Sequence, residues 1–148
     1  MRMAALLPAL LIAGCSDGRD PMPVACGGEP EALLAALRQA PAAVALHDGT
    51  RLSDCVRSAR GEGELQSLGV AYLRAADALR ASAATDAAAA LQLGYLAGAV
   101  RSGAGRTQGG LAAQLARRVE QAAALEPGAS AAAGAALSRG RRAGEARG

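Results

Sequence analysis

The sequence predicts an all-α fold, a small bundle of four to five helices. Alanine, the strongest helix former, is the dominant residue, and Tyr72 and Tyr95 are the only aromatic residues of the Phe, Trp and Tyr group. Leucines recur at steps of three and four, the spacing of one buried helix face. A core of Ala, Leu and Val buries little area per residue, so a covalent crosslink would help to hold it together.

The first residues predict an export signal. Met1-Arg2-Met3 precedes an apolar run from Ala4 to Gly14, which is too short to span a membrane. The run ends in Leu11-Ile12-Ala13-Gly14-Cys15, which resembles the lipobox of bacterial prolipoproteins. An ordinary secretory signal that happens to end near a cysteine is the alternative interpretation.

The resemblance implies a lipid anchor. The thiol of Cys15 would receive a diacylglycerol, cleavage after Gly14 would remove the signal peptide at residues 1–14, and the new amino group would be acylated, typically with palmitate. Ser16 rather than Asp follows the cysteine, which resembles an outer-membrane lipoprotein of a Gram-negative bacterium. The expected location is the cell membrane or the outer membrane, with the domain outside the cytoplasm and membrane lipid as its first partner.

The remaining cysteines, Cys26 and Cys55, are expected to pair in an oxidising compartment. The disulfide would close a loop of about 30 residues and contribute roughly 3.5 kcal/mol in the chain-entropy model. A redox or metal role is the alternative, but the chain lacks a Cys-x-x-Cys motif and has a single His, an incomplete zinc set. We therefore predict no metal and no cofactor.

Residues 15–24 are polar and rich in turn formers, which predicts a flexible tether ahead of a helical domain at residues 25–126. A first helix is expected to begin at Pro30, because proline suits the first turn, and to stop near Ala40, because Pro41 follows.

The segment after this helix is less regular. Residues 44–46 would be extended or line the core, and Asp48-Gly49 predicts a turn. Ser53 is expected to cap a short helix that runs through Arg60.

Three longer helices are predicted next. The first, at residues 65–83, has an inner stripe at Leu65, Leu68, Tyr72, Ala76, Leu79 and Ala83. The second, at residues 87–102, carries small residues every fourth position, at Ala90, Gly94, Gly98 and Ser102, which indicates close approach of another backbone. The third is expected to be capped by Thr107 and to bury Leu111, Leu115, Val119 and Ala122.

The C-terminal stretch, residues 127–148, is low in complexity and consists mainly of Ala, Gly, Ser and Arg. It has no leucine stripe, so we expect a disordered tail with at most a transient helical turn at residues 131–137. Four arginines against one glutamate make it basic, which suggests an anionic envelope polymer as one partner. Export and the lack of aromatic platforms argue against nucleic acid.

Catalytic chemistry has one weak candidate. His47 and Asp48 adjoin, and Ser53 would be the nucleophile, but sequence neighbours rarely form a catalytic pair and Asp-Gly is a turn signal. We therefore predict that the protein is not an enzyme, and we predict no catalytic residue. Instead we expect an interaction or structural module that contacts another envelope protein through the outer helix faces around Arg74, Arg101 and Arg117. A small-ligand pocket near Tyr72 and Tyr95 is the alternative.

Overall fold

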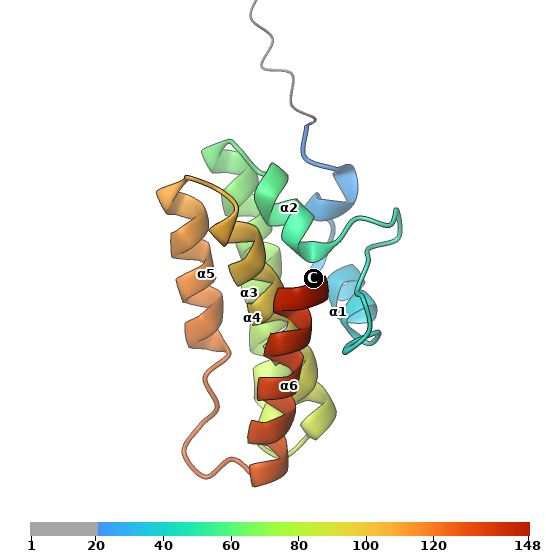
Figure 1. The fold of residues 1–148 in the computed structure, drawn as a ribbon, viewed down its shortest axis with the longest axis vertical. Helices are drawn as coiled ribbons and strands as arrows, with labels where there is room; N and C mark the ends of the chain where they lie inside the picture. Colours follow the sequence, from blue (N-terminus) through green and yellow to red (C-terminus); the bar gives the residue numbers. More distant parts are fainter. Residues whose placement is uncertain (1–20) are drawn as a thin grey trace, which may run out of the picture.

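Six α-helices and one short 3-10 helix make up the described part of the chain, residues 21–148, in the computed structural model (Figure 1). No strand occurs in these residues, and one isolated bridge joins Ala45 and Arg51. The all-α class is confirmed, with one helix more than expected. The signal peptide, Cys15 and the start of the tether lie outside the described residues. The elements are η1 (Val24–Gly27), α1 (Pro30–Leu37), α2 (Leu52–Ser58), α3 (Glu62–Ala83), α4 (Ala87–Gly105), α5 (Gly110–Ala122) and α6 (Ala131–Arg147).

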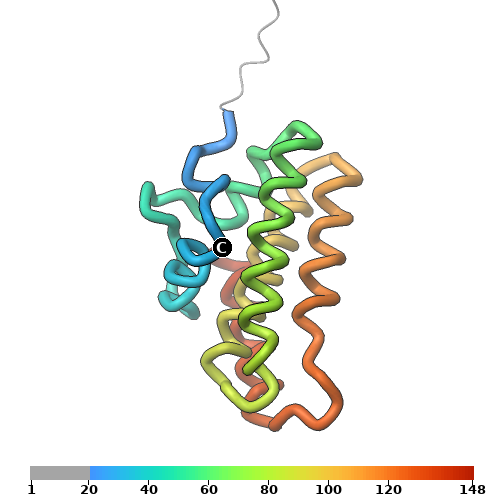
Figure 2. Tube along the Cα trace, turned by 180° about the vertical axis from the view of Figure 1, so that it is seen from behind, coloured from blue at the N-terminus to red at the C-terminus, as the bar shows by residue number. Residues whose placement is uncertain are grey.

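The four long helices α3 to α6 run along the length of the bundle, with η1 and α2 beside them near one end and α1 beside their middle (Figures 1 and 2). Helix α4 is the central element: it contacts α2, α3, α5 and α6, and 12 of its 19 residues are buried. Helix α4 begins at Ala87, as predicted, because the Asp86 side chain accepts a hydrogen bond of 2.8 Å from the Ala88 amide.

Helix α3 follows its predicted stripe. Leu68, Tyr72, Ala76, Leu79 and Ala83 are buried, and Leu65 is partly buried. The helix starts at Glu62 because the Glu64 carboxylate accepts the amide hydrogens of Arg60 at 2.8 Å and Gly61 at 3.3 Å. These bonds hold the pKa of Glu64 below its usual value.

The predicted disulfide is present. Cys26 in η1 and Cys55 in α2 are bonded across 29 residues, and both are buried. The crosslink closes a loop that contains all of α1, so it ties the beginning of the described chain to α2.

Two predicted helix caps are wrong. Helix α2 is preceded by Arg51, and Ser53 is instead buried, with its hydroxyl donating to the Gly148 carbonyl. Thr107 donates its hydroxyl to the Ala104 carbonyl at 2.9 Å, which closes the end of α4, and α5 begins only at Gly110. In both cases the hydroxyl is used by a contact that lies outside the helix it was expected to start.

The tail is the main correction to the sequence analysis, because residues 131–147 form helix α6 instead of a disordered segment. Its first turn is capped by Ser130, whose hydroxyl accepts the Ala133 amide at 3.1 Å. The Ser130 amide in turn donates to the Ala84 carbonyl at 3.0 Å, which fixes the start of α6 beside the turn between α3 and α4. The helical domain therefore extends beyond its predicted limit at residue 126.

The small residues of α4 and α6 explain why α6 is ordered. A methyl group on Gly94 or Gly98 would overlap the backbone of α6, at the carbonyls of Leu137 and Arg141 respectively. Glycines on α6 make the reciprocal contact: a methyl group on Gly140 would overlap the Leu91 carbonyl, and one on Gly144 the Tyr95 carbonyl. The close approach predicted from Gly94 and Gly98 is thus correct, and the approaching backbone is the tail itself.

Two glycine-to-alanine changes in α6 test this contact. Gly140→Ala should weaken the docking of α6, because the new methyl must push the two backbones apart; overpacking of this kind costs about 1–3 kcal/mol. Gly134→Ala is the matched control: its methyl meets nothing within 4 Å, so it should stabilise the helix by about 0.5–1 kcal/mol. Thermal unfolding and limited proteolysis of α6 measure both effects. Equal effects of the two changes would contradict the packing described here.

Candidate functional site

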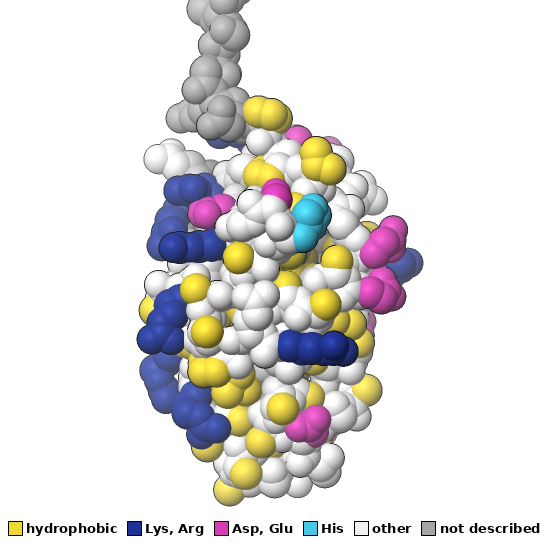
Figure 3. All heavy atoms as spheres, turned by 90° about the vertical axis from the view of Figure 1, so that its right-hand side faces the viewer, with side chains coloured by type: hydrophobic (Ala, Val, Ile, Leu, Met, Phe, Trp, Pro, Cys, Tyr) yellow, Lys and Arg dark blue, Asp and Glu magenta, His cyan; other side chains and the backbone are white. Residues whose placement is uncertain are grey.

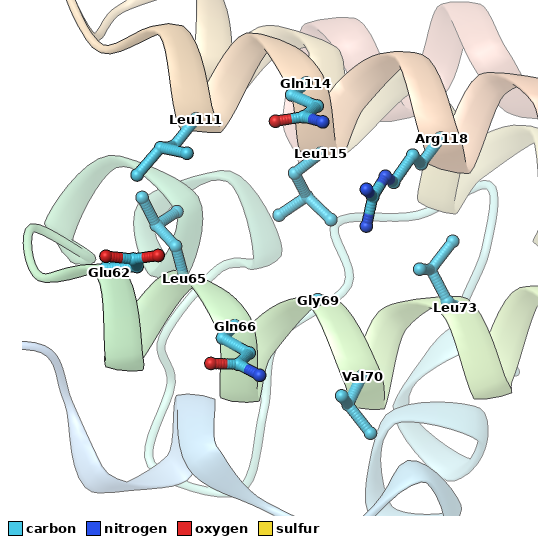
Figure 4. A pocket seen from close by; sticks show the side chains of 10 residues that line it. All are labelled: Glu62, Leu65, Gln66, Gly69, Val70, Leu73, Leu111, Gln114, Leu115 and Arg118. Atoms are coloured by element: carbon cyan, nitrogen blue, oxygen red, sulfur yellow. The ribbon is translucent and has the colours of Figure 1, made fainter.

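A groove with a volume of about 390 Å³ lies between α3 and α5 (Figure 4). Leucine side chains from both helices line it, with Glu62 at one end and Arg118 at the other, as Figure 4 shows. The lining residues are Glu62, Leu65, Gln66, Gly69, Val70, Leu73, Leu111, Gln114, Leu115 and Arg118.

A second hollow, of about 360 Å³, lies on the other side of α3, against η1 and the start of α1. Gln66 and Val70 line both hollows, and Arg74 lines the second. Four exposed residues at four-residue spacing, Glu62, Gln66, Val70 and Arg74, therefore form a row along α3, which we call the α3 ridge. The ridge has a groove on each side of its middle part.

Near the middle of the groove the residue of α3 that faces α5 is Gly69. A Cβ at this position would stand 3.5 Å from a terminal methyl of Leu115, so the Leu115 side chain packs against the backbone of α3 there. Val70 and Leu111 are each 47 % exposed, which leaves an apolar surface beside the groove. Leu111 was expected to be buried, and its exposure follows from its place at the groove edge near the beginning of α5.

The two tyrosines are part of the core. The Tyr95 hydroxyl accepts the Val44 amide at 2.9 Å, and the Tyr72 hydroxyl donates to the Leu52 carbonyl at 3.2 Å. Both rings are buried, and burial raises the pKa of Tyr72 above its ordinary value. The void beside Tyr72 has a volume of about 10 Å³, close to the space of one water molecule. Both hydroxyls therefore hold the segment from residue 44 to 52 on the bundle.

The three arginines expected to mark a contact surface lie on three different helices. Arg74 belongs to the α3 ridge, whereas Arg101 on α4 pairs with Glu120 of α5 at 3.5 Å and with Glu145 of α6 at 3.9 Å. Arg117 is exposed on α5, but its neighbour Arg118 is the residue that lines the groove.

Leu65, Leu111 and Leu115 were predicted as members of buried stripes, and a groove between these stripes was not predicted. Val70 was a detectable signal, because it is an apolar residue four positions from both Gln66 and Arg74 on the otherwise polar outer side of α3. Which side chain of α5 faces that position depends on how α3 and α5 pack, which the spacing of α3 does not specify.

The His47 region forms a turn. The Asp48 carboxylate accepts the Thr50 amide at 2.9 Å, and this bond holds the pKa of Asp48 below its usual value. His47 and Asp48 are exposed, while Ser53 is buried and bonded to Gly148. Within residues 21–148, no three His, Cys, Asp or Glu side chains gather closely enough to hold a metal ion.

Basic side chains gather along one edge of the face drawn in Figure 3. Among the residues of α6, Arg139, Arg142 and Arg147 are exposed. Arg147 also donates to the Pro41 carbonyl at 2.9 Å, so it connects α6 to the segment after α1. None of the helices described here combines the length and the hydropathy that crossing a bilayer requires.

Comparison of the chain with protein-family models, with curated protein sequences and with solved structures gave no match.

The buried state of Tyr72 predicts how stability changes at high pH. Because the folded pKa lies above the unfolded value near 10, the unfolded chain loses this proton first, and the free energy of unfolding should fall as the pH rises above 10. One such group accounts for at most about 1.4 kcal/mol per pH unit. The chain has no lysine, so no lysine titrates in this range. Tyr72→Phe should flatten the slope, measured by denaturant unfolding from pH 9 to 11, and an unchanged slope would contradict the assignment.

Proposed function

We propose that the chain is a lipid-anchored cell-envelope protein whose helical domain is a non-enzymatic interaction module. The observation that carries this proposal is the α3 ridge: an exposed row with Val70 near its middle, flanked by two hollows on rigid helices. An apolar position surrounded by polar side chains and open grooves is a common form of protein contact surface.

The proposed location rests on Leu11-Ile12-Ala13-Gly14-Cys15, which lies outside the described residues. The Cys26–Cys55 disulfide supports export, because such a bond persists in oxidising compartments. The proposed partner is another envelope protein that contacts the α3 ridge. A contact with an anionic envelope polymer is a second candidate, and the exposed arginines of α6 favour it.

The alternative of a small ligand near Tyr72 and Tyr95 has less support. The tyrosine hydroxyls are bonded to backbone groups, and the void at Tyr72 has room for about one water molecule. A ligand there would have to displace packed core residues.

The anchor is tested by the Cys15→Ser variant of the full chain. Serine cannot form the thioether, so the protein should move from the membrane pellet to the soluble fraction on cell fractionation. Loss of a labelled fatty acid from the protein in the same experiment provides a second readout. If Cys15→Ser stays in the pellet and keeps its label, the anchor is elsewhere.

The contact surface is tested by placing a charge on the α3 ridge. Val70→Glu should remove cross-linked complexes of the anchored protein, because the carboxylate would be desolvated in a contact centred on this position. Ala135→Glu is the matched control, since it also places a carboxylate at an exposed apolar position of a helix, but on α6 and outside both hollows. Immunoblots after formaldehyde treatment of intact cells compare the two variants. Equal loss in both, or in neither, would place the contact elsewhere.

A further inference from the structure

We propose that the partner of the α3 ridge is a second copy of the same chain, paired through its own α3 ridge in the antiparallel direction. This inference deepens the proposed function and rests on it for the membrane that brings the copies together. The occupant of the two grooves is then the α3 ridge of the second copy.

The charges on the α3 ridge are arranged for such a pair. Glu62 is at one end and Arg74 at the other, twelve positions apart, which is about 18 Å along a helix. When two ridges are aligned antiparallel about their midpoint, each Glu62 lies opposite Arg74 of the second copy. Gln66 of one copy then lies opposite Val70 of the other. This is the isologous pattern of a two-fold interface, in which the same two positions meet twice.

The shape of the surface fits the same arrangement. Residues spaced by four form the ridge that packs into the groove of a neighbouring helix in the commonest helix–helix geometry. The α3 ridge has the groove toward α5 on one side and the hollow toward α1 on the other. A second ridge could therefore occupy a groove while its own groove receives the first ridge. The half-exposed side chains of Val70 and Leu111 would be covered in the process.

The charged residues concerned are available for a partner. Among residues 21–148, ion pairs connect Arg57 with Asp54, Arg80 with Glu126, and Arg101 with Glu120 and Glu145. Glu62, Arg74 and Arg118 form none within the described chain. Arg118 stands at the end of the groove opposite Glu62, so it adds a second guanidinium at the place where Glu62 of the other copy would arrive (Figure 4).

The pair would be weak in dilute solution and favoured on a membrane. A contact made mainly by one helix per copy falls at the small end of specific interfaces, which bury about 1,200–2,000 Å² in total. Anchoring both copies to one bilayer raises their effective concentration. The described chain begins at the end of the bundle near α2 and the start of α3 (Figure 1). With a two-fold axis along the membrane normal, both tethers reach the bilayer at equal height.

A charge-exchange experiment tests the pair in the full-length anchored protein. Two copies that carry different epitope tags in the tether are expressed together, cross-linked by light in the membrane through a photoreactive amino acid placed at Leu111 at the groove edge, and isolated through one tag. Glu62→Arg in both copies should lower the co-isolated fraction roughly fivefold or more, since two attractive contacts become repulsive. Arg74→Glu in both copies should have the same effect. Combining Glu62→Arg in one copy with Arg74→Glu in the other should restore most of the wild-type recovery, because positions 62 and 74 again form two oppositely charged pairs.

The mixed pair also controls for folding, because a variant that fails to fold cannot be rescued by its complement. Arg106→Glu at the end of α4 should leave recovery unchanged, since this exposed residue lies outside both hollows. Absence of wild-type co-isolation, or failure of the mixed pair to recover, overturns the pairing. If Val70→Glu still removes cross-links to a different protein in that case, the proposed function survives without this inference. Retention of Cys15→Ser in the pellet would instead overturn the anchor alone.

Discussion

The contact between the backbones of α4 and α6 is the constraint on which the rest of the bundle depends. Helix α4 is buried on most sides, and the side facing α6 has no bulky side chain at the crossing, only Gly94 and Gly98. The glycines of α6 at positions 140 and 144 complete the contact. Without large apolar side chains, stabilisation here comes from close van der Waals contact between residues 91–99 of α4 and residues 137–148 in α6 and directly after it. Removing α6 would expose the central helix of the domain.

This packing also connects distant parts of the chain. The end of α6 reaches both ends of the segment between α1 and α2: Arg147 donates to the Pro41 carbonyl, and the Gly148 carbonyl accepts the hydroxyl of Ser53 in the first turn of α2. The Tyr95 hydroxyl accepts the Val44 amide of this segment, and the Tyr72 hydroxyl donates to the carbonyl of Leu52, the first residue of α2. The irregular residues 41–51 are therefore fixed by groups from α3, α4 and α6, which explains their order despite having little regular structure.

The sequence was sufficient to predict some elements and not others, for physical reasons. The helix with leucines at three- and four-residue steps was predicted well, because its apolar stripe has the period of an α-helix. The Cys26–Cys55 bond was predicted by counting cysteines. Helix α6 was missed because its buried face has small residues in place of leucines. The detectable signal was the run Ala136, Gly140, Gly144 and Gly148, which repeats the four-residue spacing of Ala90, Gly94, Gly98 and Ser102. The groove depends on which face of α5 meets α3, and no single helix specifies this.

The position of the disulfide has a mechanical consequence. Any tension applied to the chain ahead of Cys26 reaches the bond to Cys55 immediately and passes into α2, which packs on α4. Gly103 of α4 allows α2 to pack closely against it, since a Cβ at this position would stand 2.8 Å from the Cβ of Val56. Residues 27–54, including α1, lie in a closed loop that carries none of this load. A force applied at the N-terminal side would therefore act on the central helix α4 through α2. Residues 27–54 would bear no tension.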